Sequence, residues 1–421
     1  MSAQPHAEFM QIWEEGYVSN HISFANMQSP ALFVLEGAPM LGPDGRLDRP
    51  AIRAYVNAAF ASNPAFRVRL LRPFLGLTPP AWVPDDDFEL DRHIVFDDDE
   101  VDLAGDDLRR LGGAYDGTMS LRHPLWRLRF TRLRDGDVAM GLVVHHASLD
   151  GMSGMKLFRG ICQKSWDAPP PPVRDPFAGV RAPARWELPG LAVRQWRARV
   201  PGRRAAWKDF RAKPFRRRVR RVAARLLLPL RYGAGGAEAR ERMLPPIHSA
   251  YRRLDAAQVG RRARELGGTV SDLQVASIIG AWPGSERVVR LRFPVSFHSP
   301  DAPEVRNHVR DMEVTGDADA PLTSTMRSVH DQVADRAAFF AGRNVPGFPI
   351  GYSTLLPWVS RPQFFCGAEV KAMIPFPASL GRDQLAAAGV MYNGSLFVGA
   401  NMPASRDVDA TVERIASLMG G

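Results

Sequence analysis

The stretch VVHHASLDGMSGM, residues 143–155, is the most informative part of the chain for predicting its fold and its functional site. A β-rich run, residues 140–146, ends in two adjacent histidines, and an Asp-Gly pair follows after three intervening residues. Successive side chains of a strand point to opposite faces, so His145 and His146 cannot both reach one metal ion. The pattern therefore predicts no metal site and gives the two histidines different surroundings.

The chain on either side of the histidines predicts a hairpin and a tightly held loop. Residues 126–146 contain two β-rich runs around RDGD, whose Asp-Gly suits a tight turn. A histidine that leaves a buried strand and faces a cleft can act as a general base near neutral pH. Asp150 could hold the loop through an ion pair or backbone contacts, and Gly151 permits an approach that a Cβ would block. The catalytic hypothesis joins His146, as base, with His145, Asp150 and Gly151; the alternative is one satisfied buried histidine and one near solvent.

The sequence contains no nucleophile signature of the G-x-S-x-G type. A histidine base without a covalent nucleophile suits direct transfer. In that reaction it deprotonates a hydroxyl group, whose oxygen attacks an activated acyl group.

Composition indicates a globular protein of 421 residues, 45% hydrophobic and 24% charged, with two or three domains. Cys162 and Cys366 are too few for a disulfide scaffold, so we expect free thiols in a reducing compartment. The first residues lack a secretory pattern, and no run of 18 uncharged apolar residues occurs. We therefore expect an intracellular protein without a transmembrane helix.

The net charge of +10 is concentrated in one segment. Residues 194–231 hold 13 arginines and 2 lysines against 1 aspartate, so the rest of the chain is mildly acidic. Phe215 and Val219 begin an apolar stripe at helical spacing among these arginines, which predicts a membrane-surface helix. The alternatives are a helix packed on the body with a solvated arginine face, and nucleic-acid binding, for which no recognition motif is present. The predicted membrane-surface residues are Trp207, Phe210, Phe215, Arg217, Arg218 and Arg221.

Mixed α/β patterns occur on both sides of this segment. A proline-rich stretch, residues 167–190, precedes it and indicates a connection. We predict an amino-terminal subdomain at 1–175, a connecting region with an amphipathic helix at 176–245, and a carboxy-terminal subdomain at 246–421. Strands are predicted within 31–36, 67–73, 126–146, 287–297, 369–376 and 395–403, and helices within 49–63, 106–117, 254–268, 269–282 and 406–421.

The HHxxxDG pattern resembles the signature of the CoA-dependent acyltransferase superfamily, and this chain most resembles the bacterial wax ester synthase/diacylglycerol acyltransferases. Over about residues 25–419, further motifs of that family occur in the expected order. They are WVPDDDFELDRHI at 82–94, Pro124-Leu125-Trp126, GGTVSDLQVASIIGA at 267–281, FPVSFHSPDAPEVRNHV at 293–309, and the runs from 352 to 376 and from 391 to 403.

The resemblance implies two chloramphenicol acetyltransferase-like (condensation-domain-like) α/β subdomains with an active-site tunnel at their interface. It further implies that His146 is the general base, that acyl-CoA is a co-substrate, and that no other cofactor is required. The acceptor is a long-chain alcohol or diacylglycerol, and no acyl-enzyme forms. From the cysteine count and the basic segment, the expected location is cytoplasmic, peripheral at the inner membrane or at lipid inclusions, and nucleic acid is not expected as a partner.

The family motifs also carry predicted substrate-binding and supporting residues. Ser271 stands where the family has Asn, and STLLPW at 353–358 departs from its Ser-Asn-Val-Pro-Gly-Pro pattern. Arg67 is the candidate ion-pair partner of Asp150, and the alternative is a solvated arginine on a strand. Pro124 and Trp126 are expected to be packing residues. The predicted substrate-binding residues are Ser271, Asp272, Asn307, Ser353, Tyr392 and Asn393, although Ser271, Thr269 and Asp272 suit a helix cap and Asn393-Gly394 suits a turn.

Two other functions are compatible with the same sequence. One is a natural-product condensation enzyme that takes a carrier-bound acyl group and an alcohol or amine acceptor. The other is a non-catalytic lipid-binding protein, which the intact HHxxxDG motif disfavours.

Overall fold

The structure is a computed structural model. It describes residues 3–10, 18, 28–73, 78–112, 119–198, 208, 211, 214–216, 218–219, 223, 247–296, 309–340, 350–357, 359–378 and 384–421.

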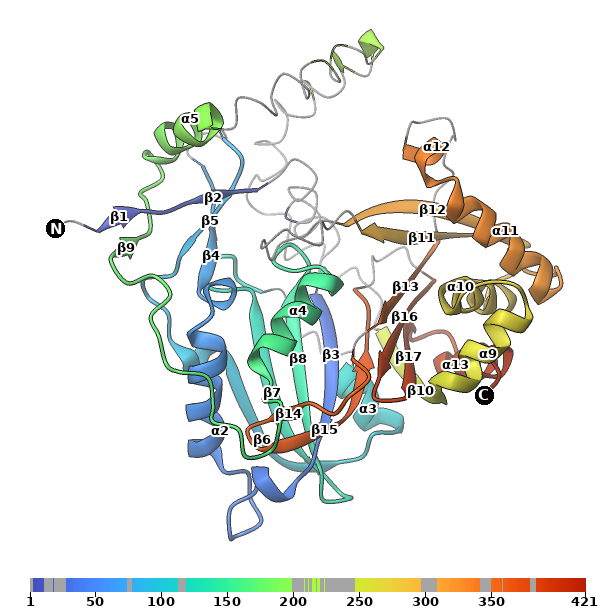
Figure 1. Ribbon diagram of the computed structural model, residues 1–421, viewed down its shortest axis with the longest axis horizontal. Helices are drawn as coiled ribbons and strands as arrows, with labels where there is room; N and C mark the ends of the chain where they lie inside the picture. Colours follow the sequence, from blue (N-terminus) through green and yellow to red (C-terminus); the bar gives the residue numbers. More distant parts are fainter. Residues whose placement is uncertain are drawn as a thin grey trace.

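The amino-terminal half is built on a six-stranded sheet in the order β14-β15-β3-β8-β7-β6 (Figure 1). All neighbouring strands are antiparallel except β6 and β7. The predicted hairpin is confirmed as β7 and β8, and Gly136 in its turn has a φ of 91°, which a glycine adopts without strain. The strands are β3 (Gln28–Leu35), β6 (Ile94–Val101), β7 (Trp126–Leu133), β8 (Val138–His145), β14 (Phe364–Phe365) and β15 (Ala368–Pro375).

A second six-stranded sheet carries the carboxy-terminal half, in the order β10-β17-β16-β13-β11-β12. The pairs β11–β13 and β13–β16 are parallel, and the others are antiparallel. The predicted turn at Asn393-Gly394 is confirmed, because both residues have positive φ, as a tight hairpin turn of this kind requires. The strands are β10 (Ile247–Asp255), β11 (Val288–Ser296), β12 (Val309–Asp317), β13 (Gly351–Pro357), β16 (Leu385–Tyr392) and β17 (Ser395–Pro403).

Helices cover both sheets, and two small sheets complete the amino-terminal half (Figure 1). The helices are α2 (Arg49–Val56), α3 (Gly105–Gly112), α4 (Gly151–Ile161), α5 (Leu188–Ala198), α9 (Ala256–Glu265), α10 (Val270–Gly280), α11 (Leu322–Ala334), α12 (Arg336–Phe340) and α13 (Val408–Met419). Short helical turns occur at Ala38–Met40, Asn57–Ala61, Pro64–Phe66 and Leu90–Arg92. The small sheets pair β1 (Gln4–Pro5) with β9 (Val180–Arg181), and join β2 (Glu8–Phe9), β5 (Ala81–Pro84) and β4 (Val68–Leu71).

The two halves are joined by strands that cross from the carboxy-terminal part of the sequence into the first sheet. Strand β15 comes from the carboxy-terminal part of the sequence but pairs with β3 in the first sheet. At its end it approaches the second sheet so closely that a Cβ on Gly399 of β17 would lie 1.9 Å from the carbonyl oxygen of Pro375. The predicted division at residue 246 therefore does not separate the two sheets completely, because β14 and β15 belong to the first.

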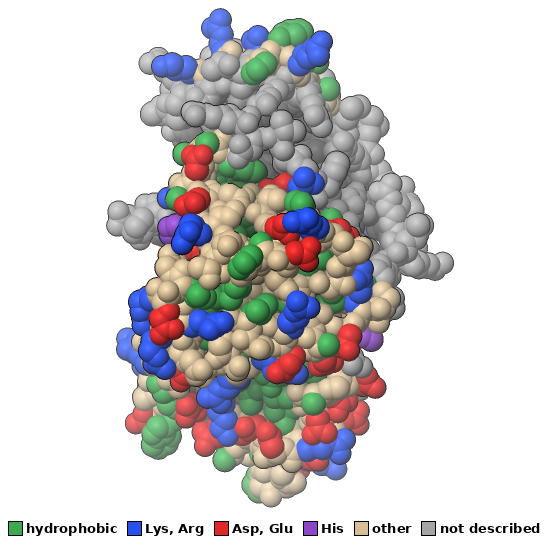
Figure 2. All heavy atoms as spheres, turned by 90° about the vertical axis from the view of Figure 1, so that its right-hand side faces the viewer, with side chains coloured by type: hydrophobic (Ala, Val, Ile, Leu, Met, Phe, Trp, Pro, Cys, Tyr) green, Lys and Arg blue, Asp and Glu red, His purple; other side chains and the backbone are tan. Residues whose placement is uncertain are grey.

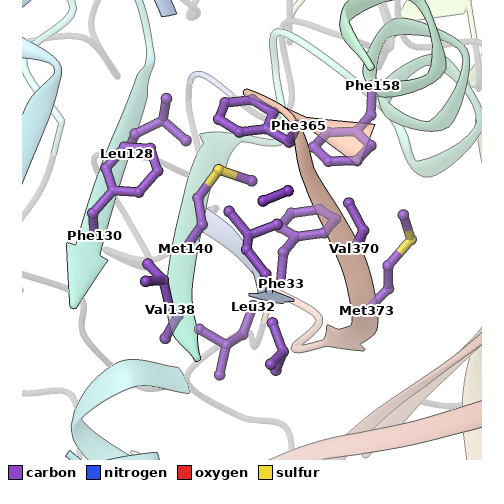
Figure 3. Packing of buried hydrophobic residues seen from close by; sticks show 14 of the residues in the cluster. Leu32, Phe33, Leu128, Phe130, Val138, Met140, Phe158, Phe365, Val370 and Met373 are labelled. Carbon is purple, nitrogen blue, oxygen red and sulfur yellow. The ribbon is translucent and has the colours of Figure 1, made fainter. Parts of the chain in front are cut away.

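Helix α4 is fixed on the first sheet by aromatic packing. The rings of Phe33 on β3 and Phe158 on α4 are stacked with their centroids 4.3 Å apart (Figure 3). Phe130, Met140 and Phe365 lie in the same core. Because α4 begins directly after the histidine loop, this packing also positions that loop.

The charges on the visible surface are mixed, as expected if the basic residues are concentrated in one segment. Figure 2 shows basic and acidic side chains interspersed over the face turned to the viewer. Cys162 and Cys366 are unbonded thiols, as predicted. Among the residues that the structure describes, no helix is both long enough and apolar enough to cross a membrane.

Candidate active site

The two histidines stand at the end of β8 in different environments, as strand alternation predicted. His145 is fully buried, and its Nδ1 accepts a hydrogen bond from the backbone N–H of Ala147 at 3.1 Å. Its carbonyl oxygen accepts the hydroxyl of Ser148 at 2.7 Å. His146 instead lines a cavity. His145 therefore fixes the turn after the strand, and His146 is the histidine that a ligand can reach.

Asp150 holds the loop through backbone contacts. It is 2% exposed and caps α4, where Oδ1 accepts the backbone N–H of Ser153 at 2.7 Å. A carboxylate in this position satisfies an N–H group that the helix leaves open, and it interacts favourably with the helix dipole. The loop between His146 and α4 is thus tied at both ends.

Gly151 allows the two halves to meet beside His146. A Cβ at this position would lie 2.8 Å from Cδ2 of Leu356 on β13 of the second sheet. Both residues line the cavity. The predicted close approach at Gly151 is therefore confirmed, and the neighbour belongs to the opposite half of the molecule.

The cavity has a volume of about 280 Å³ and lies between the two sheets. Its walls come from β3, β8, α4 and β15 on one side and from β11, β12, β13 and β16 on the other. Most of the lining side chains are apolar, including Phe33, Leu142, Met155, Phe158, Leu355 and Val390. Such a wall suits an aliphatic chain, and the imidazole of His146 is one of its few polar groups.

Polar residues at the start of α10 cap the helix and do not line the cavity. Thr269 and Asp272 form a capping box, in which Oδ2 of Asp272 accepts the backbone N–H of Thr269 at 2.9 Å. The same oxygen lies 2.9 Å from Nδ1 of His330, and the Asp272 carboxylate raises the pKa of that imidazole. The cap is Thr269 and not Ser271, and neither Ser271 nor Asp272 is among the described residues that line the cavity. The predicted substrate contacts of this pair therefore have no support in the geometry.

Three other predicted substrate-binding residues are also absent from the described residues that line the cavity. Ser353 is fully buried, and its hydroxyl accepts a hydrogen bond from Gln274 at 3.2 Å. The hydroxyl of Tyr392 donates to the carbonyl of Val370 at 2.8 Å and accepts from the backbone N–H of Gln363. Asn393 forms the tight turn after β16. Ser353 and Tyr392 bond to core groups and Asn393 shapes a loop, so the geometry gives no support to the prediction that these residues bind substrate. Asn307 lies outside the described residues.

The predicted packing role of Trp126 is confirmed, and the predicted pairing of Arg67 is wrong. Trp126 is 2% exposed, and its indole N–H donates to the carbonyl of Phe66 at 2.8 Å; Pro124, two residues earlier, is also buried. Arg67 donates to the carbonyl of Ala61 at 3.1 Å, and its guanidinium lies 4.5 Å from the ring centre of Phe88. These contacts hold Arg67 against Ala61 and Phe88 rather than against Asp150.

Sequence reasoning missed several polar residues of the cavity wall, and three of them lie together. Arg292 on β11, Asp311 on β12 and Tyr352 on β13 all line it. The guanidinium of Arg292 lies 5.0 Å from the ring centre of Tyr352, and its Nη1 is 3.9 Å from a carboxylate oxygen of Asp311. Alternation along these strands could have placed them on one face, but it could not have shown that this face borders the cavity.

The described part of the basic segment presents apolar side chains to solvent. Phe215 is 71% exposed and Val219 is 49% exposed. The guanidinium of Arg218 lies 5.8 Å from the ring centre of Phe215. The predicted membrane-surface residues Trp207, Phe210, Arg217 and Arg221 lie outside the described residues.

Comparison with known sequences assigns the chain to one family. The sequence model of the wax ester synthase/diacylglycerol acyltransferase catalytic domain matches residues 23–274. A Mycobacterium tuberculosis protein, provisionally named a diacylglycerol O-acyltransferase, is 28% identical over 396 residues, covering 83% of this chain and 76% of that protein. Another protein of this organism with the same provisional name is 28% identical over 255 residues, covering 58% of this chain and 52% of that protein.

Known structures share the fold. The wax ester synthase/diacylglycerol acyltransferase from Marinobacter aquaeolei VT8 superposes with a TM-score of 0.61 at 16% identity, covering 98% of both chains. The first condensation domain of the CDA synthetase gives a TM-score of 0.61 at 14% identity, covering 98% of this chain and 96% of that domain. These structures confirm the predicted arrangement of two chloramphenicol acetyltransferase-like subdomains. Since the family match extends over more than half of the chain, the protein belongs to the wax ester synthase/diacylglycerol acyltransferase family and is an acyltransferase.

Proposed function

We propose that this enzyme moves a fatty acyl group from acyl-CoA to the hydroxyl group of a long-chain alcohol or diacylglycerol, which gives a wax ester or a triacylglycerol. The observation that carries the proposal is the placement of His146 in the wall of an apolar cavity between the two sheets. A long aliphatic chain fits such walls, and an imidazole among them can accept the proton of the acceptor hydroxyl. The family assignment supports the same reaction class.

The proposed reaction takes place in one displacement, without an acyl-enzyme. As His146 removes the hydroxyl proton, the acceptor oxygen attacks the thioester carbonyl carbon and a C–O bond forms. The tetrahedral intermediate then collapses, the C–S bond breaks, and the imidazolium returns its proton to the departing CoA thiolate. Asp150 ties the histidine loop to the start of α4, and Leu356 of the second sheet packs close to Gly151, so both help to position the base. No cofactor enters this scheme beyond acyl-CoA as co-substrate.

A substrate panel tests this reaction. Purified enzyme is incubated with acyl-CoAs of several chain lengths and with hexadecanol, a diacylglycerol or hexadecylamine, and the products are identified by mass. We expect ester products from free acyl-CoA. Amide products, or ester formation only after addition of an acylated carrier protein, would instead support a condensation enzyme of the same fold.

We further propose that the enzyme is cytoplasmic and binds the inner membrane or lipid inclusions through residues 206–232. The support is the exposure of Phe215 and Val219 among arginines, since apolar and basic side chains on one helix suit an anionic lipid surface. Water-insoluble acceptors would be available at that surface.

Flotation with liposomes tests the membrane proposal. We expect the enzyme to float with vesicles containing anionic lipid, and less with neutral vesicles. The double substitution Phe215→Ser with Val219→Ser should reduce flotation several-fold without loss of stability, because both side chains are already exposed. The matched control is Val288→Ser on β11, where the side chain is 52% exposed but outside the basic segment. Equal flotation of the double variant and this control would contradict the proposal.

A further inference from the structure

The second sheet presents an ion pair to the cavity that the proposed chemistry does not use. On β11, Leu291 and Phe293 pack in the second core, whereas Arg292 and Pro294 line the cavity, as strand alternation requires. The side chain of Arg292 is 14% exposed, and its partner Asp311 is 35% exposed. The pair therefore lies where a largely apolar wall meets more open space.

Folding alone does not account for this position. The largely buried Arg292 loses hydration energy, and its attraction to the more exposed Asp311 at 3.9 Å offsets little of that loss, so the pair adds little net stability. The pair also reduces the apolar area available to an aliphatic ligand. Charged groups retained at such a cost in a ligand cavity are candidates for recognition of the ligand.

The donor and acceptor groups of Arg292 and Asp311 favour some ligand classes over others. Arg292 supplies several N–H donors in a planar fork, and the carboxylate of Asp311 accepts hydrogen bonds. Because the two charges cancel, the site suits a neutral group with both acceptor and donor oxygens better than it suits a phosphate. The ester carbonyls and the hydroxyl of a glycerolipid have this character, whereas a plain fatty alcohol offers only the hydroxyl that reacts.

We propose that Arg292 and Asp311 form an acceptor subsite that binds the oxygen atoms of a diacylglycerol-type acceptor, with Arg292 as the specificity-determining residue. Arg292 donates to an ester carbonyl of the acceptor, and the contact with the Tyr352 ring orients the guanidinium. This inference rests on the proposed acyltransferase function and narrows its acceptor class. The enzyme then prefers glycerolipid acceptors to fatty alcohols of similar size.

The same strand provides a matched control. Arg290 precedes Arg292 by two residues, and its Nε lies 3.6 Å from a carboxylate oxygen of Glu313 on β12. In the register of β11 and β12, this pair has the same diagonal relation as Arg292 with Asp311. Arg290 is 45% exposed and is not among the described residues that line the cavity. A substitution there removes an equivalent charge and ion pair at a side chain that does not line the cavity.

Direct binding measurements test the subsite without requiring turnover. The probes are 1,2-dioctanoylglycerol and 2-octyl-1-dodecanol, which have comparable carbon content and differ mainly in the ester oxygens. We expect Arg292→Met to weaken binding of dioctanoylglycerol about tenfold, the loss of roughly one charged hydrogen bond, and to change binding of the branched alcohol less than twofold. Asp311→Asn, at a more exposed position, should also weaken dioctanoylglycerol selectively, and Arg290→Met should affect neither ligand.

The results that would contradict the subsite differ from those that would contradict the proposed function. Equal weakening of both ligands by Arg292→Met, unchanged binding of dioctanoylglycerol in both cavity variants, or a wild-type enzyme that does not prefer dioctanoylglycerol overturns the subsite. If Arg292→Met does not fold, the selectivity of Asp311→Asn decides the matter. Absence of ester products from wild-type enzyme in the substrate panel overturns the proposed function instead, whatever the binding measurements show.

Discussion

Replacement of His146 by Ala is expected to lower kcat/KM for acyl transfer by about 10²–10⁴-fold, the usual contribution of a general base. The reason is its position: His146 lines the cavity, while its neighbour His145 is buried and accepts a backbone hydrogen bond. Without an imidazole at this site, the acceptor hydroxyl must lose its proton to water. We expect the melting temperature to change little, because the removed side chain borders a cavity rather than the core.

Substitution of the neighbouring His145 distinguishes an effect on stability from an effect on catalysis. His145→Ala removes a fully buried side chain, and we expect it to lower the free energy of unfolding by about 2–5 kcal/mol, as large-to-small substitutions in cores do. Its activity, measured per folded molecule, should therefore exceed that of His146→Ala. Full activity of the His146→Ala enzyme would contradict the proposed base. The non-catalytic, lipid-binding alternative would instead be favoured if the wild type showed no acyl transfer and His146→Ala left lipid binding unchanged.

Local rules were sufficient for the site's central geometry. Two β-rich runs around an Asp-Gly predict the β7–β8 hairpin, and the alternation of side chains separates His145 from His146. The Asp150 cap and the close approach at Gly151 follow from the same kind of reasoning, since each depends on a few adjacent residues. The motif resemblance then supplied the two-subdomain fold.

Contacts between distant segments could not be derived in this way. Strand β15 leaves its half of the sequence to pair with β3, and nothing in the sequence of residues 368–375 specifies that partner. Tyr392 and Ser353 lie in strands covered on both faces, so alternation does not reveal which face borders the cavity. For the same reason Arg292, which does line the cavity, has no local signal that distinguishes it from Arg290.

A second large effect is expected from His93, the histidine of the WVPDDDFELDRHI motif. Its ring lies between those of Phe88 and Trp126, with the Trp126 ring centre 4.5 Å away. Nδ1 lies 2.8 Å from the carbonyl oxygen of Trp126, which fixes the proton on that nitrogen. Nε2 is buried and has no hydrogen-bond partner among the described residues. Burial, with smaller contributions from nearby cations, lowers the pKa of His93 to about 4.

This pKa makes the protein sensitive to acid. An unfolded histidine has a pKa of about 6.5, so between pH 6.5 and 4 the unfolded chain binds a proton that the folded protein does not. Stability from a neutral His93 is thus fully present above pH 6.5 and is lost as the pH falls toward 4. The corresponding free energy is about 3 kcal/mol in total, with a slope of at most about 1.4 kcal/mol per pH unit.

Urea unfolding of wild-type protein and His93→Leu between pH 7.5 and 4 measures this effect. At pH 7.5 the variant should be less stable by about 1 kcal/mol, because it loses the hydrogen bond to Trp126. That difference should shrink and then reverse as the pH falls, since leucine takes up no proton. His330→Gln is the opposite control: the Asp272 carboxylate raises the pKa of His330, so this residue stabilises the fold at low pH and its replacement should steepen the acid loss. A difference between wild type and His93→Leu that stays constant with pH would show that His93 is not held neutral by burial.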